Sequence, residues 1–119
     1  MSGEPTLDPA ALDRLLEITG DDVAFVDELI DTYLEDALVQ LAAMDDAAAT
    51  GDAAALVRPA HSLKSNSENV GAVALTVLCR ALEEGARGGD TADAAERVAA
   101  IRREFEAART GLLAARAAR

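Results

Sequence analysis

Apolar residues recur at every third or fourth position along most of this chain, and this period constrains the fold more than any other feature. The clearest segment runs from Val26 to Met44, where apolar side chains fall on one helical face and carboxylates fall on the opposite face. Half of the 119 residues are apolar, but few are aromatic. This composition favours close-packed helices over a β-sandwich, which needs more β-branched and aromatic residues. We therefore predict an all-α fold.

Capping and helix-ending residues divide this pattern into five helices. Asp8 followed by Pro9 is typical of a helix start, and Asp52 is a second cap. We expect helices at about residues 9–19, 22–49, 53–70, 72–87 and 91–113. Because the connections are short, the four longer helices predict an antiparallel up-down four-helix bundle, with the short additional N-terminal helix packed across one end. The chain is expected to be one domain, residues 1–119, with a core of about residues 8–113 and loose ends at residues 1–7 and 114–119.

Charge and cysteine content exclude several classes of function. A net charge of −11 argues against binding of nucleic acid or of an anionic membrane surface. Cys79 is the only cysteine, so the chain has no internal disulfide and no cysteine metal cluster, and with a single histidine we predict no metal site. The first residues lack the basic and apolar regions of a signal peptide, and no apolar segment reaches the length of a membrane span. The expected compartment is the cytoplasm.

His61 is the only histidine, and two cations lie one helical turn from it. Lys64 follows it by three residues and Arg58 precedes it by three, so the three side chains share a face of the third predicted helix. Neutral imidazole is available as a nucleophile near pH 7, and flanking cations offset the charge of a phosphoryl group. The inward apolar stripe of this helix does not include His61, which is therefore predicted to lie off the core. Pro59 predicts a kink or an irregular first turn just before it.

Other residues on this side of the helix extend the predicted site. Ser65 is the best placed to line it, one turn after His61. Val57 is the one apolar residue that the period puts in the exposed row, and Glu68 belongs to the same row. We predict that Val57 and Glu68 contact a docked partner, and that Val57→Asp weakens binding with little loss of folding. The alternative for Lys64 and Arg58 is that they are ordinary solvated charges on a helix surface.

The stretch around His61 also resembles a known motif. Its sequence AHSLKSNSENVGA, followed by Leu75 and by the pair Leu82 and Glu83, is similar to the motif of histidine-containing phosphotransfer (HPt) domains. The resemblance implies a helical bundle that carries phosphate on a histidine between the aspartates of receiver domains.

The resemblance further implies roles and partners. His61 is then the phosphoacceptor, Lys64 the cation that stabilises the phosphate, and Gly71 the glycine that ends the motif helix, while Ser65 stands where the family most often has Gly. The implied partners are response-regulator receiver domains and a hybrid histidine kinase, and the expected state is a monomer. No cofactor is expected on this chain, because Mg²⁺ and the acceptor aspartate belong to the receiver.

Two other functions remain open from the sequence. One is the phosphoacceptor module of a chemotaxis-type histidine kinase, phosphorylated by a separate ATP-binding protein. The other is a helical adaptor without a catalytic role, in which His61 is incidental. The chain has no P-loop and no other nucleotide-binding glycine pattern, so we predict a phosphocarrier without kinase machinery. The sequence does not determine which imidazole nitrogen is phosphorylated.

Overall fold

The chain folds into α-helices joined by short connections, here described from a computed structural model that covers residues 4–118. Within these residues there are five helices and no strand. The all-α class that the apolar period predicts is confirmed. The helices are α1 (Ala10–Ile18), α2 (Val23–Thr50), α3 (Ala53–Asn69), α4 (Val73–Arg87) and α5 (Ala94–Ala117).

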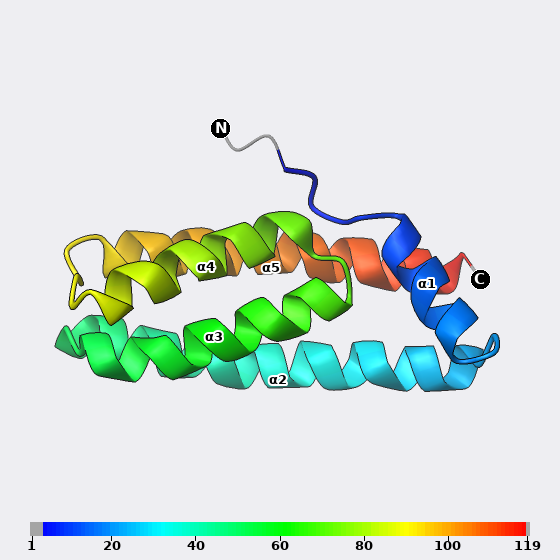
Figure 1. The fold of residues 1–119 in the computed structure, drawn as a ribbon, viewed down its shortest axis with the longest axis horizontal. Coiled ribbons are helices and arrows are strands. Elements are labelled where there is room, and N and C mark those ends of the chain that lie inside the picture. The colour runs from blue at the N-terminus through cyan, green and yellow to red at the C-terminus, as the bar shows by residue number, and fades with distance from the viewer. Residues whose placement is uncertain (1–3, 119) are drawn as a thin grey trace.

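The four longer helices lie side by side along the length of the molecule (Figure 1). Helix α2 packs against α3 and α5, and α4 packs against the same two helices, so the four form a closed ring around one core. Figure 1 shows that each successive connection lies at the opposite end from the one before, while α1 crosses the end where the chain terminates. This arrangement leaves one face of α3 uncovered between α2 and α4.

The core consists of the apolar stripes that the sequence predicts. The apolar period places six residues on one face of α5, and all six are buried. On the inward face of α3 it places Leu56, Ala60, Leu63 and Ser67, with Val70 just after the helix, and these five are also buried. A polar pair lies within this core, where the Tyr33 hydroxyl and the Ser67 hydroxyl are 2.8 Å apart and hydrogen-bonded. Their pairing satisfies two groups that are costly to bury alone. The α5 stripe is Ala94, Val98, Ile101, Phe105, Ala108 and Leu112.

Aspartate side chains cap the starts of two helices, and the Asp52 cap is as predicted. The Asp22 carboxylate accepts a hydrogen bond from the backbone N–H of Phe25 (2.9 Å) at the start of α2, and that of Asp52 accepts one from Ala55 (3.1 Å) at the start of α3. The predicted start of the last helix is wrong, because Asp90 instead caps a turn and α5 begins at Ala94.

The end of α5 also differs from the prediction. We expected the chain to become loose from residue 114, but the helix continues to Ala117. Arg116 explains the difference, because its guanidinium donates to the backbone oxygen of Asp27 and forms an ion pair with Asp31 on α2. A long-range contact therefore holds a terminal turn that the local sequence leaves weak. Arg119 lies outside the described residues.

The described part of the N-terminal segment contacts the bundle at two points. The Ala74 N–H donates to the Pro5 oxygen (3.0 Å), and Leu7 packs against the core. Residues 1–3 of the expected loose segment lie outside the described residues. None of the helices in residues 4–118 combines the length and the apolar character that a membrane span requires.

Gly71 joins this N-terminal region to the end of α3. Its φ of +75° lies in the left-handed region, and its oxygen accepts a hydrogen bond from the Asp8 N–H (2.8 Å). A Cβ at this position would overlap the Cβ of Ala11 on α1. Gly71 therefore ends α3, as predicted, and also provides the space in which α1 packs.

Candidate functional site

Helix α3 presents His61 to solvent. The helix continues without a break through Pro59, so the irregular first turn that we considered is absent from it. Leu56, Ala60 and Leu63 are buried on the opposite side. The His61 side chain consequently points away from the core, and 56% of its surface is exposed.

A buried carboxylate from the neighbouring helix holds this imidazole. Glu83 on α4 accepts a hydrogen bond from His61, with Nδ1 and Oε2 3.0 Å apart. Its Oε1 lies 2.6 Å from Lys64 Nζ, and its Oε2 also accepts from Arg87 Nη2 (2.7 Å) and Nε (3.1 Å). We call His61, Lys64, Glu83 and Arg87 the Glu83 cluster.

Electrostatics keep Glu83 ionised although only 5% of its side chain is exposed. The Lys64 ammonium is the main cause, because its attraction outweighs the effect of burial, which by itself raises the pKa of a carboxyl group. Hydrogen bonds from Arg87 and His61 lower the pKa further, to about 2. An ionised carboxylate can only accept hydrogen bonds, so Nδ1 of His61 carries the proton. In the neutral ring Nε2 then holds the free lone pair and is the nucleophilic atom.

Two predicted site residues lie outside this cluster. Arg58 and Ser65 are exposed on α3, and neither side chain has an ion pair or hydrogen bond with any residue in 4–118. Both flank His61 by about one turn on the same face. They are available to an incoming group, whereas Lys64 is only 20% exposed and is already paired.

The two residues predicted to contact a partner differ in their surroundings. Glu68 is exposed and forms an ion pair with Arg80 of α4 (3.3 Å). Val57 was expected to be exposed, but it is half-buried and packs against the core. The expectation was wrong because α4 packs beside α3 here, and Val57 lines a shallow surface hollow together with Ala86 and Arg87 that shields part of its side chain.

Sequence reasoning did not identify the roles of Glu83 and Arg87. Glu83 was recognised only as part of the motif, and Arg87 was not singled out. A signal was present, because Glu83 follows Leu82 and lies four residues after Cys79, at the edge of a buried stripe. A carboxylate at such an edge needs cationic partners, and Arg87 lies at the i+4 position that supplies one.

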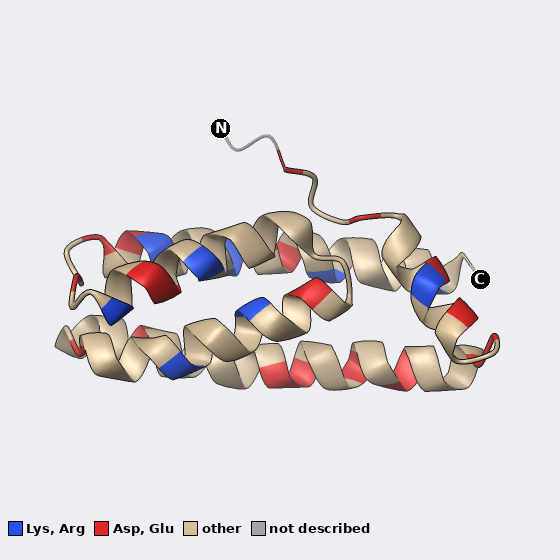
Figure 2. Ribbon diagram, in the orientation of Figure 1, with Lys and Arg blue, Asp and Glu red and all other residues tan. Residues whose placement is uncertain are grey.

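Charge is distributed unevenly around this face. Figure 2 shows Lys and Arg alternating with Asp and Glu on the adjoining parts of α3 and α4, whereas the visible side of α2 carries Asp and Glu. The cations of a chain with a net charge of −11 are therefore represented beside His61, where Glu83 pairs with two of them. In the described part of the chain, no group of three or more His, Cys, Asp or Glu side chains is placed to hold a metal ion.

A helical bundle that exposes one imidazole, binds its Nδ1 through a buried carboxylate and sets two cations beside it defines a phosphotransfer domain. The comparisons agree with this class. The family model described as the Hpt domain matches residues 28–111. The crystal structure of histidine-containing phosphotransfer protein B (HptB) from Pseudomonas aeruginosa PAO1 has a TM-score of 0.87 and 36% sequence identity, covering 99% of each chain. A comparison with curated proteins gives no match. The chain belongs to the Hpt family, and its role is histidine phosphotransfer in a phosphorelay.

Proposed function

We propose that this protein relays a phosphoryl group between receiver-domain aspartates through Nε2 of His61. The observation that carries the proposal is the hydrogen bond between His61 Nδ1 and the ionised Glu83 carboxylate. It fixes one tautomer and leaves the other nitrogen, on an exposed ring, with its lone pair free for attack.

The transfer step then needs no proton to leave or enter. The Nε2 lone pair attacks the phosphorus of an aspartyl phosphate, and the bond between phosphorus and the aspartate oxygen breaks as the carboxylate leaves. The product ring carries phosphate on Nε2 and a proton on Nδ1, so it is cationic, and the negative charge of Glu83 stabilises it. In the reverse direction neutral imidazole leaves, because Nδ1 has kept its proton.

Cations near His61 offset the charge of the phosphoryl oxygens. Lys64 uses one contact on Glu83, and its ammonium has further N–H donors for a phosphate. Arg87 is more than half exposed and also reaches the cluster from α4. Arg58 and Ser65 lie on the uncovered face and line the approach to His61. Mg²⁺ and the reacting aspartate are supplied by the receiver domain.

The proposal also includes the architecture, the oligomeric state, the partners and the compartment of the protein. We take the ring of α2 to α5, with α1 across its end, to be an antiparallel up-down four-helix bundle that acts as a monomer. Its partners are response-regulator receiver domains, one of which belongs to a hybrid histidine kinase. This relay operates in the cytoplasm.

Transfer of acid-labile phosphate tests the proposal. Receiver domains from the same genome are phosphorylated and mixed with wild-type protein and with His61→Gln. We expect label on the wild type, located on Nε2 by NMR of the phosphorylated protein, and none on the variant. Label that persists on His61→Gln, or a phosphoryl group on Nδ1, would contradict the mechanism.

A second experiment, with a kinase as the phosphoryl donor, tests the alternative role as the phosphoacceptor module of a histidine kinase. A purified kinase catalytic domain is mixed with the protein and ATP in the absence of any receiver. We expect no label under these conditions, because the relay receives its phosphoryl group from an aspartate. Rapid labelling by the kinase alone, without transfer from receivers, would favour the alternative.

A further inference from the structure

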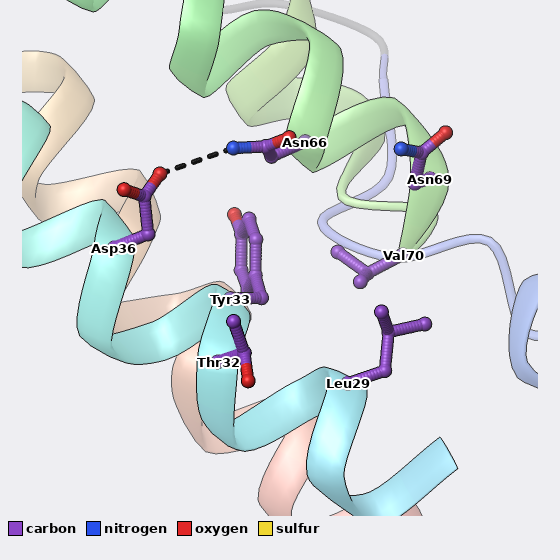
Figure 3. Close-up of a pocket in the computed structure, with 7 residues that line it drawn as sticks. All are labelled: Leu29, Thr32, Tyr33, Asp36, Asn66, Asn69 and Val70. Atoms are coloured by element: carbon purple, nitrogen blue, oxygen red, sulfur yellow. Dashed lines mark hydrogen bonds between the residues drawn. The ribbon is translucent and has the colours of Figure 1, made fainter. Parts of the chain in front are cut away.

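A pocket lies at the surface between α2 and the last turns of α3 (Figure 3). Leu29, Tyr33 and Val70 line its interior, and its volume is about 210 Å³. Since an apolar cavity of about 150 Å³ admits a group as large as benzene, this pocket has room for one aliphatic or aromatic side chain.

The rim of the pocket carries a fixed negative charge. Asn66 on α3 donates a hydrogen bond to the Asp36 carboxylate on α2 (3.1 Å), as Figure 3 shows. Gln40 donates to the same carboxylate (3.3 Å). Both donors are neutral amides, so the charge of Asp36 is held in place but not neutralised.

One row of α2 continues the pocket in both directions along the surface. Residues 25, 29, 32, 36 and 39 are spaced alternately four and three apart, so they share the flank of α2 that faces α3. The ends of this row are apolar and exposed, with Val39 at 64% and Phe25 at 47%. The flank toward α5 is different, because Asp31 and Asp45 on it form ion pairs with Arg116 and Arg102.

The position of the pocket relative to His61 decides what covers it. Asn66 and Asn69 line the pocket and lie five and eight residues after His61 on the same helix, about 7.5 and 12 Å along its axis. A specific protein interface covers about 800 Å² on each partner, which corresponds to a disc with a radius of roughly 16 Å. A receiver domain centred on His61 is therefore wide enough along α3 to reach the pocket, although His61 faces α4 and Asn66 faces α2.

We propose that this pocket, with the row on α2, is the anchor that selects the receiver domain. The receiver places one apolar side chain into the pocket and a neighbouring Lys or Arg against Asp36. The inference rests on the proposed function, and it separates two tasks on one face: the Glu83 cluster performs the chemistry, and the pocket sets affinity for the partner.

Thr32→Trp tests the anchor, because Thr32 is exposed at the rim and an indole there fills the space. Thr110→Trp is the matched control, since Thr110 is also exposed but lies on α5, on the opposite side of the helix ring from α3. Transfer is measured from those phosphorylated receivers that label the wild type. For Thr32→Trp we expect KM to rise at least tenfold with kcat changed less than twofold, and for Thr110→Trp no change in either.

A second pair of variants and a small-molecule donor complete the design. Val39→Glu should also raise KM, whereas Leu38→Glu should not, because Leu38 (55% exposed) lies seven residues from both Asp31 and Asp45 on the α5 flank. Phosphoramidate phosphorylates imidazole with loss of ammonia and needs no docking, so its reaction with His61 should be unchanged in every variant.

The possible outcomes distinguish an anchor for the receiver from a contact between two copies of this chain and from failure of the proposed function. Equal KM values for the two Trp variants and for the two Glu variants would overturn the anchor while leaving the relay intact. Dimers of the wild type that dissociate in Thr32→Trp, as seen by sedimentation, would overturn it in favour of a second copy of this chain. Failure of the proposed function looks different, because then the wild type itself accepts no phosphoryl group from any receiver.

Discussion

The Glu83 carboxylate contributes to stability and to phosphotransfer through the same contacts, so Glu83→Gln should weaken both. The substitution keeps the size of the side chain and removes one negative charge. It leaves Lys64, which is only 20% exposed, without its counterion. Glu84→Gln is the control, because Glu84 is the exposed neighbour and loses the same charge.

The lowered pKa sets the size of the stability effect. A fall in the Glu83 pKa from 4.5 to about 2 corresponds to roughly 3 kcal/mol, at about 1.4 kcal/mol for each pKa unit. The side chains of His61 and Arg87 are more than half exposed, and solvent screening reduces their share. We therefore expect the free energy of unfolding to fall by about 1–2 kcal/mol at pH 7.

The pH dependence follows from the direction of the shift. The folded-state pKa of Glu83 lies below the unfolded value, so the stabilisation is fully present above about pH 4.5 and is lost as the pH falls through about 2. The difference between wild type and Glu83→Gln should shrink to less than half its pH 7 value at about pH 3. Urea unfolding followed by circular dichroism at the two pH values measures this. A difference that does not change with pH, or an equal loss in Glu84→Gln, would refute the reasoning.

Phosphotransfer should respond to the same substitution. A glutamine amide oxygen still accepts from Nδ1, but it lacks the charge that stabilises the cationic phosphorylated ring. We expect the rate of transfer from a phosphorylated receiver to fall by roughly ten- to a hundredfold, with no change in Glu84→Gln. A normal rate in Glu83→Gln would show that the hydrogen bond alone suffices.

Three further substitutions, measured by urea unfolding, test the packing of the helices around the site. Gly71→Ala should cost at least about 2 kcal/mol, well beyond Gly89→Ala, which shares the positive φ but has open space around it; equal losses would contradict the role of Gly71 in packing α1. Ser67→Ala should cost about 1–3 kcal/mol, because it leaves the buried Tyr33 hydroxyl unpaired, and a neutral result would mean that this hydroxyl finds another partner. Val57→Asp should destabilise the fold by about 1–3 kcal/mol, because Val57 packs against the core, and an unchanged midpoint would restore the prediction of an exposed position.

The apolar period by itself determined the helices and the faces that they bury. The six-residue stripe of α5 and the five-residue stripe of α3 are buried as the period predicts. Caps are also local, since the carboxylates of Asp22 and Asp52 bond backbone N–H groups three residues away. Both features depend on neighbours within one or two helical turns, so they can be derived without knowledge of the fold.

The pair of His61 and Lys64 could be predicted for the same reason, because a spacing of three residues places two side chains on one helical face. The other half of the Glu83 cluster could not. Glu83 and Arg87 belong to the next helix, and the covered position of Val57 depends on that helix as well. Such contacts depend on the rotation and separation of two packed helices, which the period of either helix leaves undetermined.

The tertiary structure alone decided the chemical state of the site. The packing of α3 against α4 brings the Glu83 carboxylate to within 3.0 Å of Nδ1, and this contact fixes the tautomer and leaves Nε2 as the nucleophile. It also decided the end of α5, where Arg116 reaches Asp31 across 85 residues of sequence. A local pattern can place a residue on a face, but only packing chooses the group that faces it from another helix.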